Sequence, residues 1–128
     1  LISRMERKGL KIISMKMMLA SRELLEEHYA EHEGKPFFED LVSYVSSSPV
    51  VAMVVAGEEA IPMLRLLCGA TKVDQAVPGT IRGDFAAATT KNIIHASDSP
   101  ESAEREIDLW FSGDEILEWE DPNKEWFV

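Results

Sequence analysis

The sequence predicts an α+β fold in which helices pack against a small sheet. Residues 10–19 and 50–55 have the apolar patterns of strands, and several other stretches have the spacing and capping residues of helices. Strands and helices alternate irregularly along the chain. No internal repeat, low-complexity tract or linker interrupts them, so we expect a single domain over residues 1–128.

The chain opens with the end of a helix, and a strand follows it. Leu1, Ile2 and Met5 share one side of a helical turn, and Gly9 is a typical helix stop. Residues 10–19 then alternate as a strand does. One predicted strand face carries Ile13, Met15, Met17 and Leu19. Because the chain starts inside a helix without an initiator methionine, we expect further residues upstream of Leu1 in the complete protein.

Two helices and a second strand come next. Ser21 is a typical N-cap for a helix that reaches Tyr29, and the Gly34-Lys35-Pro36 stretch breaks this helix. A second short helix carries apolar residues at helical spacing, namely Phe37, Leu41, Val42 and Val45. Pro49 then introduces residues 50–55, whose unbroken apolar, β-branched run is typical of a strand covered on both faces.

The second half of the chain is less regular. Residues 58–68 predict a helix, but residues 70–90 show no sustained period, and loops of that length in compact domains are usually functional. We expect a short strand over residues 92–95. The run Asp98-Ser99-Pro100-Glu101 then predicts the capped start of a helix that ends at Phe111.

The composition excludes several classes of protein. The formal net charge is −10, from 23 acidic and 13 basic residues, which argues against a broad nucleic-acid surface but leaves room for a small basic pocket. No apolar run has the length of a membrane span, and no signal peptide opens the chain, so we expect a cytoplasmic protein without a membrane partner. The single cysteine, Cys68, permits no intrachain disulfide.

His95 is the leading candidate for covalent chemistry. It is expected to close a strand a few residues before a helix N-terminus, where free backbone N–H groups favour an anion. A neutral imidazole is a good nucleophile, and its ordinary pKa leaves it mostly neutral at cytoplasmic pH. The alternative from position alone is a structural histidine that is hydrogen-bonded at a strand end.

Other polar residues are candidates for supporting roles. Glu106, in the helix after His95, can return to orient the imidazole, and Ser97 can bond near the same site. Their alternatives are a solvated helix acid and a turn serine. Arg65, Arg82 and Thr71 are candidate phosphate ligands. As isolated residues they are equally consistent with ordinary surface positions.

The remaining motifs give weaker signals. Phe37 offers a ring for base stacking, although core packing explains the same residue. His28 and His32 stand four residues apart on one helix, but no third ligand accompanies them, so we predict no protein-bound metal. The sequence contains neither a Gly-x-x-x-x-Gly-Lys loop nor a Gly-x-Gly-x-x-Gly motif.

Several long motifs resemble one known family. The run Asn92-Ile93-Ile94-His95-Ala96-Ser97-Asp98-Ser99, with the acidic helix after it, resembles the active-site signature of nucleoside diphosphate kinases. Pro78-Gly79-Thr80-Ile81-Arg82-Gly83-Asp84-Phe85 is similar to the phosphate-side loop of that family. His28-Tyr29, Lys35-Pro36-Phe37-Phe38 and residues 48–54 resemble its helical hairpin and following strand. The resemblance covers nearly all of the chain in order.

The resemblance implies a ferredoxin-like antiparallel sheet and ping-pong transfer of a γ-phosphoryl group through a phosphohistidine. His95 would be the nucleophile, Glu106 would orient its ring, and Ser97 would assist. Mg²⁺ would travel on the nucleotide phosphates and not in a protein cage. The implied partners are nucleoside tri- and diphosphates. The implied nucleotide-binding residues are Tyr29, Phe37, Leu41, Arg65, Thr71, Arg82, Thr89 and Asn92.

The sequence departs from the family pattern in three places. The first strand of the sheet, with its Lys-Pro-Asp-Gly motif, is missing, so we expect the domain over 1–128 to be N-terminally incomplete. Ala96 stands where the family usually has Gly, which is tolerable if its φ is negative. Residues 86–91 lack the Gly that usually precedes Asn92.

Two hypotheses from different classes follow. The first is the kinase itself, and the alternative is a catalytically weak nucleotide-binding or scaffold homologue. The resemblance also implies a homo-oligomer, either a hexamer or a tetramer. The aromatic residues of the acidic tail, Trp119, Trp126 and Phe127, pack either on a neighbouring subunit or on the chain itself.

Overall fold

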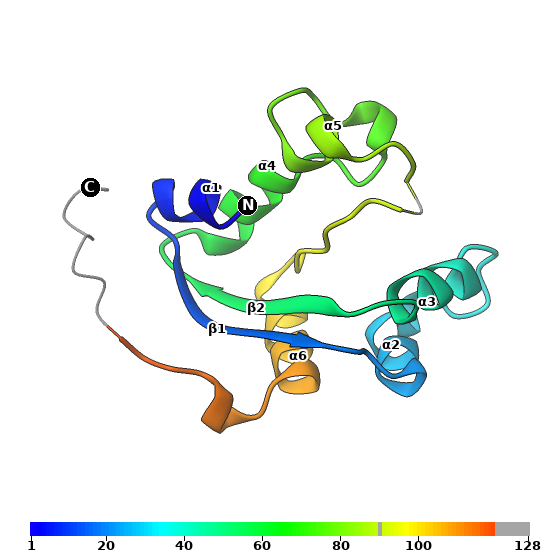
Figure 1. Cartoon of the computed structure of the whole chain (residues 1–128), viewed down its shortest axis with the longest axis horizontal. Helices are drawn as coiled ribbons and strands as arrows, with labels where there is room; N and C mark the ends of the chain where they lie inside the picture. The colour runs from blue at the N-terminus through cyan, green and yellow to red at the C-terminus, as the bar shows by residue number, and fades with distance from the viewer. Residues whose placement is uncertain (90, 120–128) are drawn as a thin grey trace.

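A two-stranded antiparallel sheet runs through the middle of the computed structural model, which describes residues 1–89 and 91–119 (Figure 1). β1 (Lys11–Met18) pairs with β2 (Val50–Ala56), and an irregularity between Ile12 and Ser14 shifts the register. No strand precedes β1 in the described residues. The predicted α+β class and both predicted strands are confirmed.

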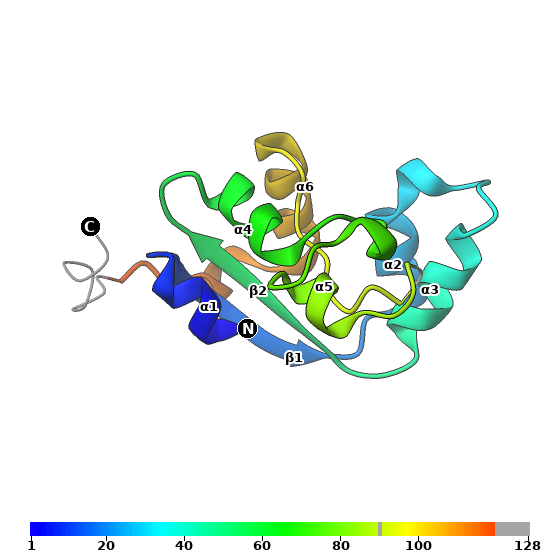
Figure 2. The ribbon, with the colours of Figure 1, turned by 90° about the horizontal axis from the view of Figure 1, so that it is seen from above.

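Helices gather at both ends of the sheet and beside it. At one end lie α2 (Arg22–His28) and α3 (Phe38–Ser46), and at the other lie α1 (Ile2–Arg7) and α4 (Ala60–Cys68) (Figure 1). Seen from above, α4, α5 (Ile81–Phe85) and α6 (Pro100–Trp110) lie to one side of the strands (Figure 2). Three 3₁₀ turns complete the elements, at Ala30–His32, Val73–Gln75 and Gly113–Glu115.

The main apolar cluster lies where α2, α3 and α6 meet. Ala20, Leu25 and Val42 are buried at its centre, and the side chains packed around them include Tyr29 and Trp110. Ser21 caps α2 as predicted, because its side chain accepts a hydrogen bond from the Leu24 amide. The cluster therefore fixes the end of α2 against the end of α6.

The prediction that the second strand is covered on both faces is wrong. Val51 is 56% exposed, and Met15 and Met17 on the same sheet face are also exposed, whereas Val54 is buried. The helices α4, α5 and α6 cover only one side of the strands (Figure 2).

The predicted strand over residues 92–95 is also wrong. Ile93 adopts a φ of +61°, and the Ile94 amide bonds to the Asn92 carbonyl at 2.7 Å, which is a tight three-residue turn of the γ type. In the part of the chain that the structure describes, the nearest ladder contact is the isolated bridge between Ala88 and Lys91. Without a neighbouring strand, the segment has no backbone partners to hold it extended.

The long irregular stretch over residues 70–90 contains more structure than predicted. It includes a 3₁₀ turn and the short helix α5, and Thr80 caps α5 by accepting from the Gly83 amide. Thr90 and the tail residues Trp126 and Phe127 lie outside the described residues. The single-domain organisation over 1–128 stays a prediction.

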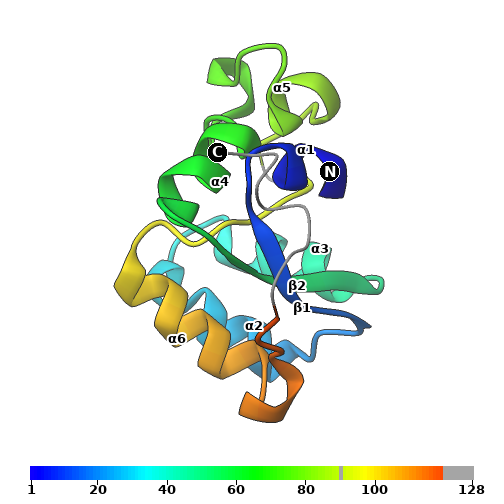
Figure 3. The same cartoon turned by 90° about the vertical axis from the view of Figure 1, so that its left-hand side faces the viewer.

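The segment over residues 91–99 crosses the molecule. It runs from the layer that contains α4 and α5 to the start of α6 (Figure 3). Ser99 caps α6 with Pro100 in its first turn, as predicted, and the helix ends one residue before the expected Phe111. Among residues 1–89 and 91–119, no helix has the length and apolar composition needed to cross a bilayer.

Replacing Ser99 with alanine removes the side-chain acceptor of the Ser102 amide at 3.0 Å. We expect the free energy of unfolding to fall by about 1 kcal/mol, as measured by urea denaturation. Ser43→Ala, on the exposed surface of α3, is the matched control and is expected to leave stability within about 0.5 kcal/mol of the wild type. Equal stability of the two variants would contradict a capping role for Ser99.

Candidate active site

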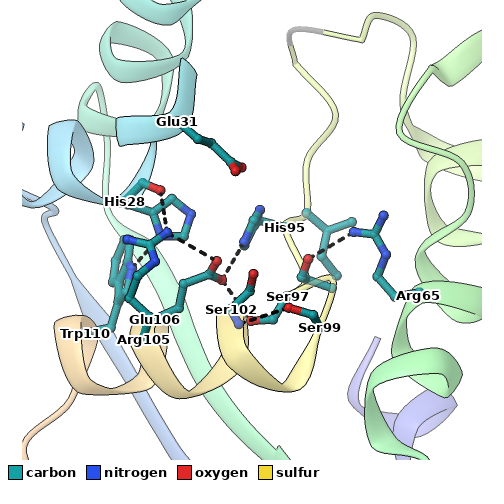
Figure 4. Close-up of polar contacts among 12 residues, drawn as sticks. His28, Glu31, Arg65, His95, Ser97, Ser99, Ser102, Arg105, Glu106 and Trp110 are labelled. Carbon is teal, nitrogen blue, oxygen red and sulfur yellow. Dashed lines mark hydrogen bonds and ion pairs between the residues drawn. The ribbon is translucent and has the colours of Figure 1, made fainter. Parts of the chain in front are cut away.

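His95 projects from the crossing segment just before α6, and its side chain is 46% exposed. Its Nε2 atom lies 2.9 Å from Oε1 of Glu106, which is one turn and a half into α6 (Figure 4). The Ser97 hydroxyl donates to the same carboxylate oxygen at 2.8 Å. The structure therefore brings together the three residues predicted to carry the chemistry.

The carboxylate of Glu106 is largely buried and stays ionised. Burial pushes its pKa upward, but the hydrogen bonds from His95 and Ser97 and the nearby positive charge outweigh burial, so its pKa lies below the ordinary value. An ionised carboxylate accepts hydrogen bonds only, which assigns the proton between the two side chains to Nε2 of His95. In the described residues no hydrogen bond reaches Nδ1 of His95, so this nitrogen keeps a free lone pair.

His28 and Trp110 form the wall behind His95. The ring of His28 lies edge-on to that of His95, with centroids 4.5 Å apart and an angle of 74° between planes. Nδ1 of His28 accepts a hydrogen bond from the indole of Trp110 at 2.9 Å, and Tyr29 packs edge-on at 4.6 Å from His28. Burial first, and then the proximity of His95, lower the pKa of His28 to about 4.

The donor atoms of His28, His95 and Glu106 lie within 4.8 Å of one another, as three metal ligands would. Histidine binds a metal through a deprotonated nitrogen. Because the Trp110 indole can only donate, Nδ1 of His28 is the acceptor, and the proton sits on Nε2. That tautomer has no free lone pair for a metal in the cluster, and the absence of a protein-bound ion stays a prediction.

Two arginines reach the crossing segment from the opposite side. Arg65 of α4 donates to the Ala96 carbonyl at 3.1 Å (Figure 4). Arg82 of α5 is only 3% exposed and donates to the carbonyls of Gly69 and Ile94 at 3.0 and 2.6 Å. Both guanidinium groups therefore lie beside the residues that flank His95, and Nε of Arg82 has no partner in the described residues.

The other predicted nucleotide ligands lie around this centre at different distances. Tyr29 is 6.3 Å from His95 between ring centroids. Phe37 is 37% exposed and lies one turn before Leu41 on α3, with the His32 ring 5.2 Å away. Asn92 lies in the turn before His95.

Thr71 and Thr89 lie in the segments on either side of α5. Thr71 is exposed in the loop after α4, and Thr89 accepts from the Val73 amide at 3.2 Å. No contact that the structure describes joins Thr71 or Thr89 to His95.

The loop that carries Arg82 is tied to the start of the chain. Arg4 of α1 donates to the Gly79 carbonyl at 3.0 Å and to Asp84 at 3.1 Å, while the Gly79 amide donates to the other oxygen of Asp84 at 2.8 Å. Ala96 is not among the residues with a positive φ, so the alanine fits the position where the family usually has glycine.

A comparison with known proteins decides the family. The family model described as "Nucleoside diphosphate kinase" matches residues 1–116. The chain belongs to the nucleoside diphosphate kinase family.

Individual relatives agree with this assignment. A nucleoside diphosphate kinase of Archaeoglobus fulgidus is 59% identical over 125 residues, which are 98% of this chain and 83% of the relative. One from Treponema pallidum is 52% identical over 126 residues, covering 98% and 85%. The solved nucleoside diphosphate kinase of Halobacterium salinarum, in complex with CDP, superimposes with a TM-score of 0.95 at 46% identity, covering 99% of this chain and 85% of that one.

Sequence reasoning missed His28 and Trp110 as neighbours of the nucleophile. The sequence predicts His28 only as part of a helix, of a motif that resembles the family and of a weak metal pair, and it predicts Trp110 only as part of a helix. The spacing from Glu106 to Trp110, one turn along the same helix face, was the available signal. The partner of Trp110 on α2 is 82 residues away in the chain, so periodicity alone could not supply it.

The buried neutral His28 makes stability depend on pH. Its folded-state pKa of about 4 lies below the ordinary 6.5, so the unfolded chain takes up a proton first as the pH falls. Its contribution is full above pH 6.5 and is lost on going down to about pH 4, which amounts to about 3 kcal/mol. We expect the difference in unfolding free energy between wild type and His28→Gln to shrink by about this amount between pH 7 and pH 4, in urea titrations. A constant difference would contradict a buried neutral His28.

Proposed function

We propose that this nucleoside diphosphate kinase transfers the γ-phosphoryl group by a ping-pong mechanism through Nδ1 of His95. The observation that carries the proposal is the bond between Nε2 of His95 and Glu106, which leaves Nδ1 as the free nucleophilic nitrogen. The His95 side chain is 46% exposed, whereas that of Glu106 is 13% exposed. Because Nε2 is bonded to Glu106, the substrate is proposed to approach Nδ1, the nitrogen that carries the lone pair.

Each half-reaction exchanges one phosphorus bond. The Nδ1 lone pair attacks the γ-phosphorus of a triphosphate, an N–P bond forms, and the bond from the γ-phosphorus to the bridging oxygen breaks, which releases a diphosphate. The ring becomes positively charged, and the Glu106 carboxylate, bonded to Nε2–H, stabilises this charge. A second diphosphate then attacks the phosphohistidine through a terminal β-phosphate oxygen, and His95 returns to its starting form. No net proton is taken up by the protein.

The remaining candidate residues supply binding and orientation. Arg65, Arg82 and Thr71 are proposed to hold the β- and γ-phosphates, and only two of the five N–H groups of Arg82 bond to backbone carbonyls in the described residues. Phe37 stacks on the base. Further contacts come from Tyr29, Leu41, Thr89 and Asn92. That the Halobacterium salinarum relative was solved with CDP supports a diphosphate as ligand of this site.

Mg²⁺ is proposed to enter as part of the nucleotide substrate. Glu106 is the carboxylate nearest to His95, and both His95 and Ser97 already bond to it. The described residues at the phosphate side offer guanidinium groups and no cluster of oxygen ligands such as Mg²⁺ requires. The ion lowers the charge that the arginines must neutralise, and positioning then supplies most of the catalysis.

The alternative is a nucleotide-binding homologue with weak transfer. The observation that favours it is that both terminal nitrogens of Arg82 already donate to backbone carbonyls. The homo-oligomer, a hexamer or tetramer, and the cytoplasmic location stay predictions.

A phosphoenzyme assay tests the proposal. With γ-labelled ATP and Mg²⁺, we expect about one acid-labile phosphoryl group per chain, discharged by added diphosphate and absent from His95→Ala. His32→Gln is the control for loss of another histidine and is expected to keep the label. A wild-type chain that binds nucleotide but takes no label would establish the scaffold alternative instead.

Replacing Glu106 with glutamine removes the charge that orients His95. The amide can donate to Nε2 and so favour the tautomer whose proton sits on Nδ1, which blocks the attack. We expect the rate of phosphoenzyme formation to fall by about 10²-fold in rapid-quench measurements. Glu104→Gln, on the exposed side of the same helix, is the matched control and should keep the wild-type rate. Equal rates in both variants would contradict the orienting role.

A further inference from the structure

The proposed transfer leaves the contact between Trp110 and His28 without a role. His28 is 6% exposed and lies at the end of α2, where its ring faces His95 on one side and the Trp110 indole on another. Arg105 holds this end of α2 by donating to the carbonyls of Glu27 and His28 at 3.2 Å each. The position of the His28 ring is thus fixed from the same helix that carries Glu106.

We propose that Trp110 and His28 are positioning residues for phosphoryl transfer: the indole N–H holds His28 as the neutral Nε2–H tautomer, and this uncharged ring keeps the imidazole of His95 edge-on with Nδ1 toward the phosphates. The inference rests on the proposed function. The single hydrogen bond between His95 and Glu106 still lets the imidazole rotate about the line that joins Nε2 to the carboxylate oxygen. Contact with the His28 ring would restrict this rotation.

The contact is chemically selective. Trp110 has a donor and no acceptor, so it is compatible only with a His28 whose Nδ1 lone pair is free. If Nδ1 of His28 carried a proton, either in the other neutral tautomer or in the cation, its N–H would point at the indole N–H of Trp110. Two donors cannot form a hydrogen bond with each other. The indole therefore excludes two of the three forms that histidine adopts.

The neutral state matters because the ring of His95 gains positive charge as it is phosphorylated. A cationic His28 with its centroid 4.5 Å away would oppose that charge and compete for the Glu106 carboxylate. The ionisable groups that face His28 come from three segments: His95 from the crossing segment, Glu106 and Arg105 from α6, and His32 from the 3₁₀ turn after α2. Only Glu106 among them favours a charged His28, and it is already bonded to His95.

The test compares Trp110→Phe with Trp119→Phe. Trp119 also donates its indole N–H at 2.9 Å, to the Ile12 carbonyl near the other end of the molecule, so the control loses the same kind of bond away from the site. Two-bond ¹⁵N–¹H spectra of labelled histidine report the tautomer of each ring, and His28→Gln assigns the signal. The pH profile of phosphoenzyme formation between pH 5 and pH 8 reports the consequence.

We expect wild type and Trp119→Phe to show His28 as a single Nε2–H tautomer, with the same pH profile in both. In Trp110→Phe we expect mixed or protonated His28 and phosphoenzyme formation that falls about tenfold more steeply toward pH 5. The double variant Trp110→Phe with His28→Gln should lose this steeper fall toward pH 5, because it no longer has the His28 imidazole that takes up the proton. A merely structural contact would not give that recovery.

Three results would overturn the inference. One is a wild-type His28 that carries its proton on Nδ1 in the ¹⁵N–¹H spectra. This measurement does not depend on whether Trp110→Phe folds. Another is a pH profile of Trp110→Phe that matches that of Trp119→Phe. The third is a wild-type chain that forms no phosphoenzyme, which overturns the proposed function as well, whereas the first two leave that function standing.

Discussion

The hydrogen bond between Nε2 of His95 and the carboxylate of Glu106 is the interaction on which the site depends. It decides which nitrogen is free, and it places a negative charge behind the ring that becomes positive in the proposed transfer. The bond can form only because α6 starts five residues after His95 and its Ser99 cap holds the first turn in place. Local capping therefore has a direct consequence for chemistry, since a frayed first turn would move the crossing segment relative to Glu106.

The buried guanidinium of Arg82 stabilises the fold and also lies beside the candidate active site. Its bonds to the Gly69 and Ile94 carbonyls join the end of α4 to the crossing segment, which has no strand partner of its own among the described residues. Burying a guanidinium is costly unless its donors are used, and one donor, Nε, has no partner there. In the proposed site, a phosphate bound to the remaining N–H groups of Arg82 would lower that cost, and its binding would then stabilise the segment.

Much of the fold could be predicted from the sequence, because helix caps and apolar strand patterns depend on residues that are close together in the chain. Ser21 and Ser99 cap helices where predicted, and both apolar strands pair. The turn at Ile93 could not be predicted, since a β-branched residue at positive φ contradicts its own propensity. The bond from Arg82 to the Ile94 carbonyl, which adjoins this turn, comes from a residue 12 positions away in the chain. In the site, the predicted grouping of His95 with Glu106 relied on family motifs. The indole bond to His28 spans 82 residues and leaves no pattern in the sequence.

The net charge of the protein affects the electrostatic attraction or repulsion of an anionic nucleotide as it approaches this site. The formal net charge is −10, and a polyphosphate is also an anion, so the long-range field opposes association. At physiological ionic strength that field is screened over about 8 Å, whereas the proposed phosphate ligands Arg65 and Arg82 are partly or fully out of solvent and would act at contact distance. Attraction is therefore confined to the pocket itself. In the proposed reaction, a nucleotide that carries Mg²⁺ meets less of the opposing field, which would favour the metal complex over the free nucleotide before any contact with His95 is made.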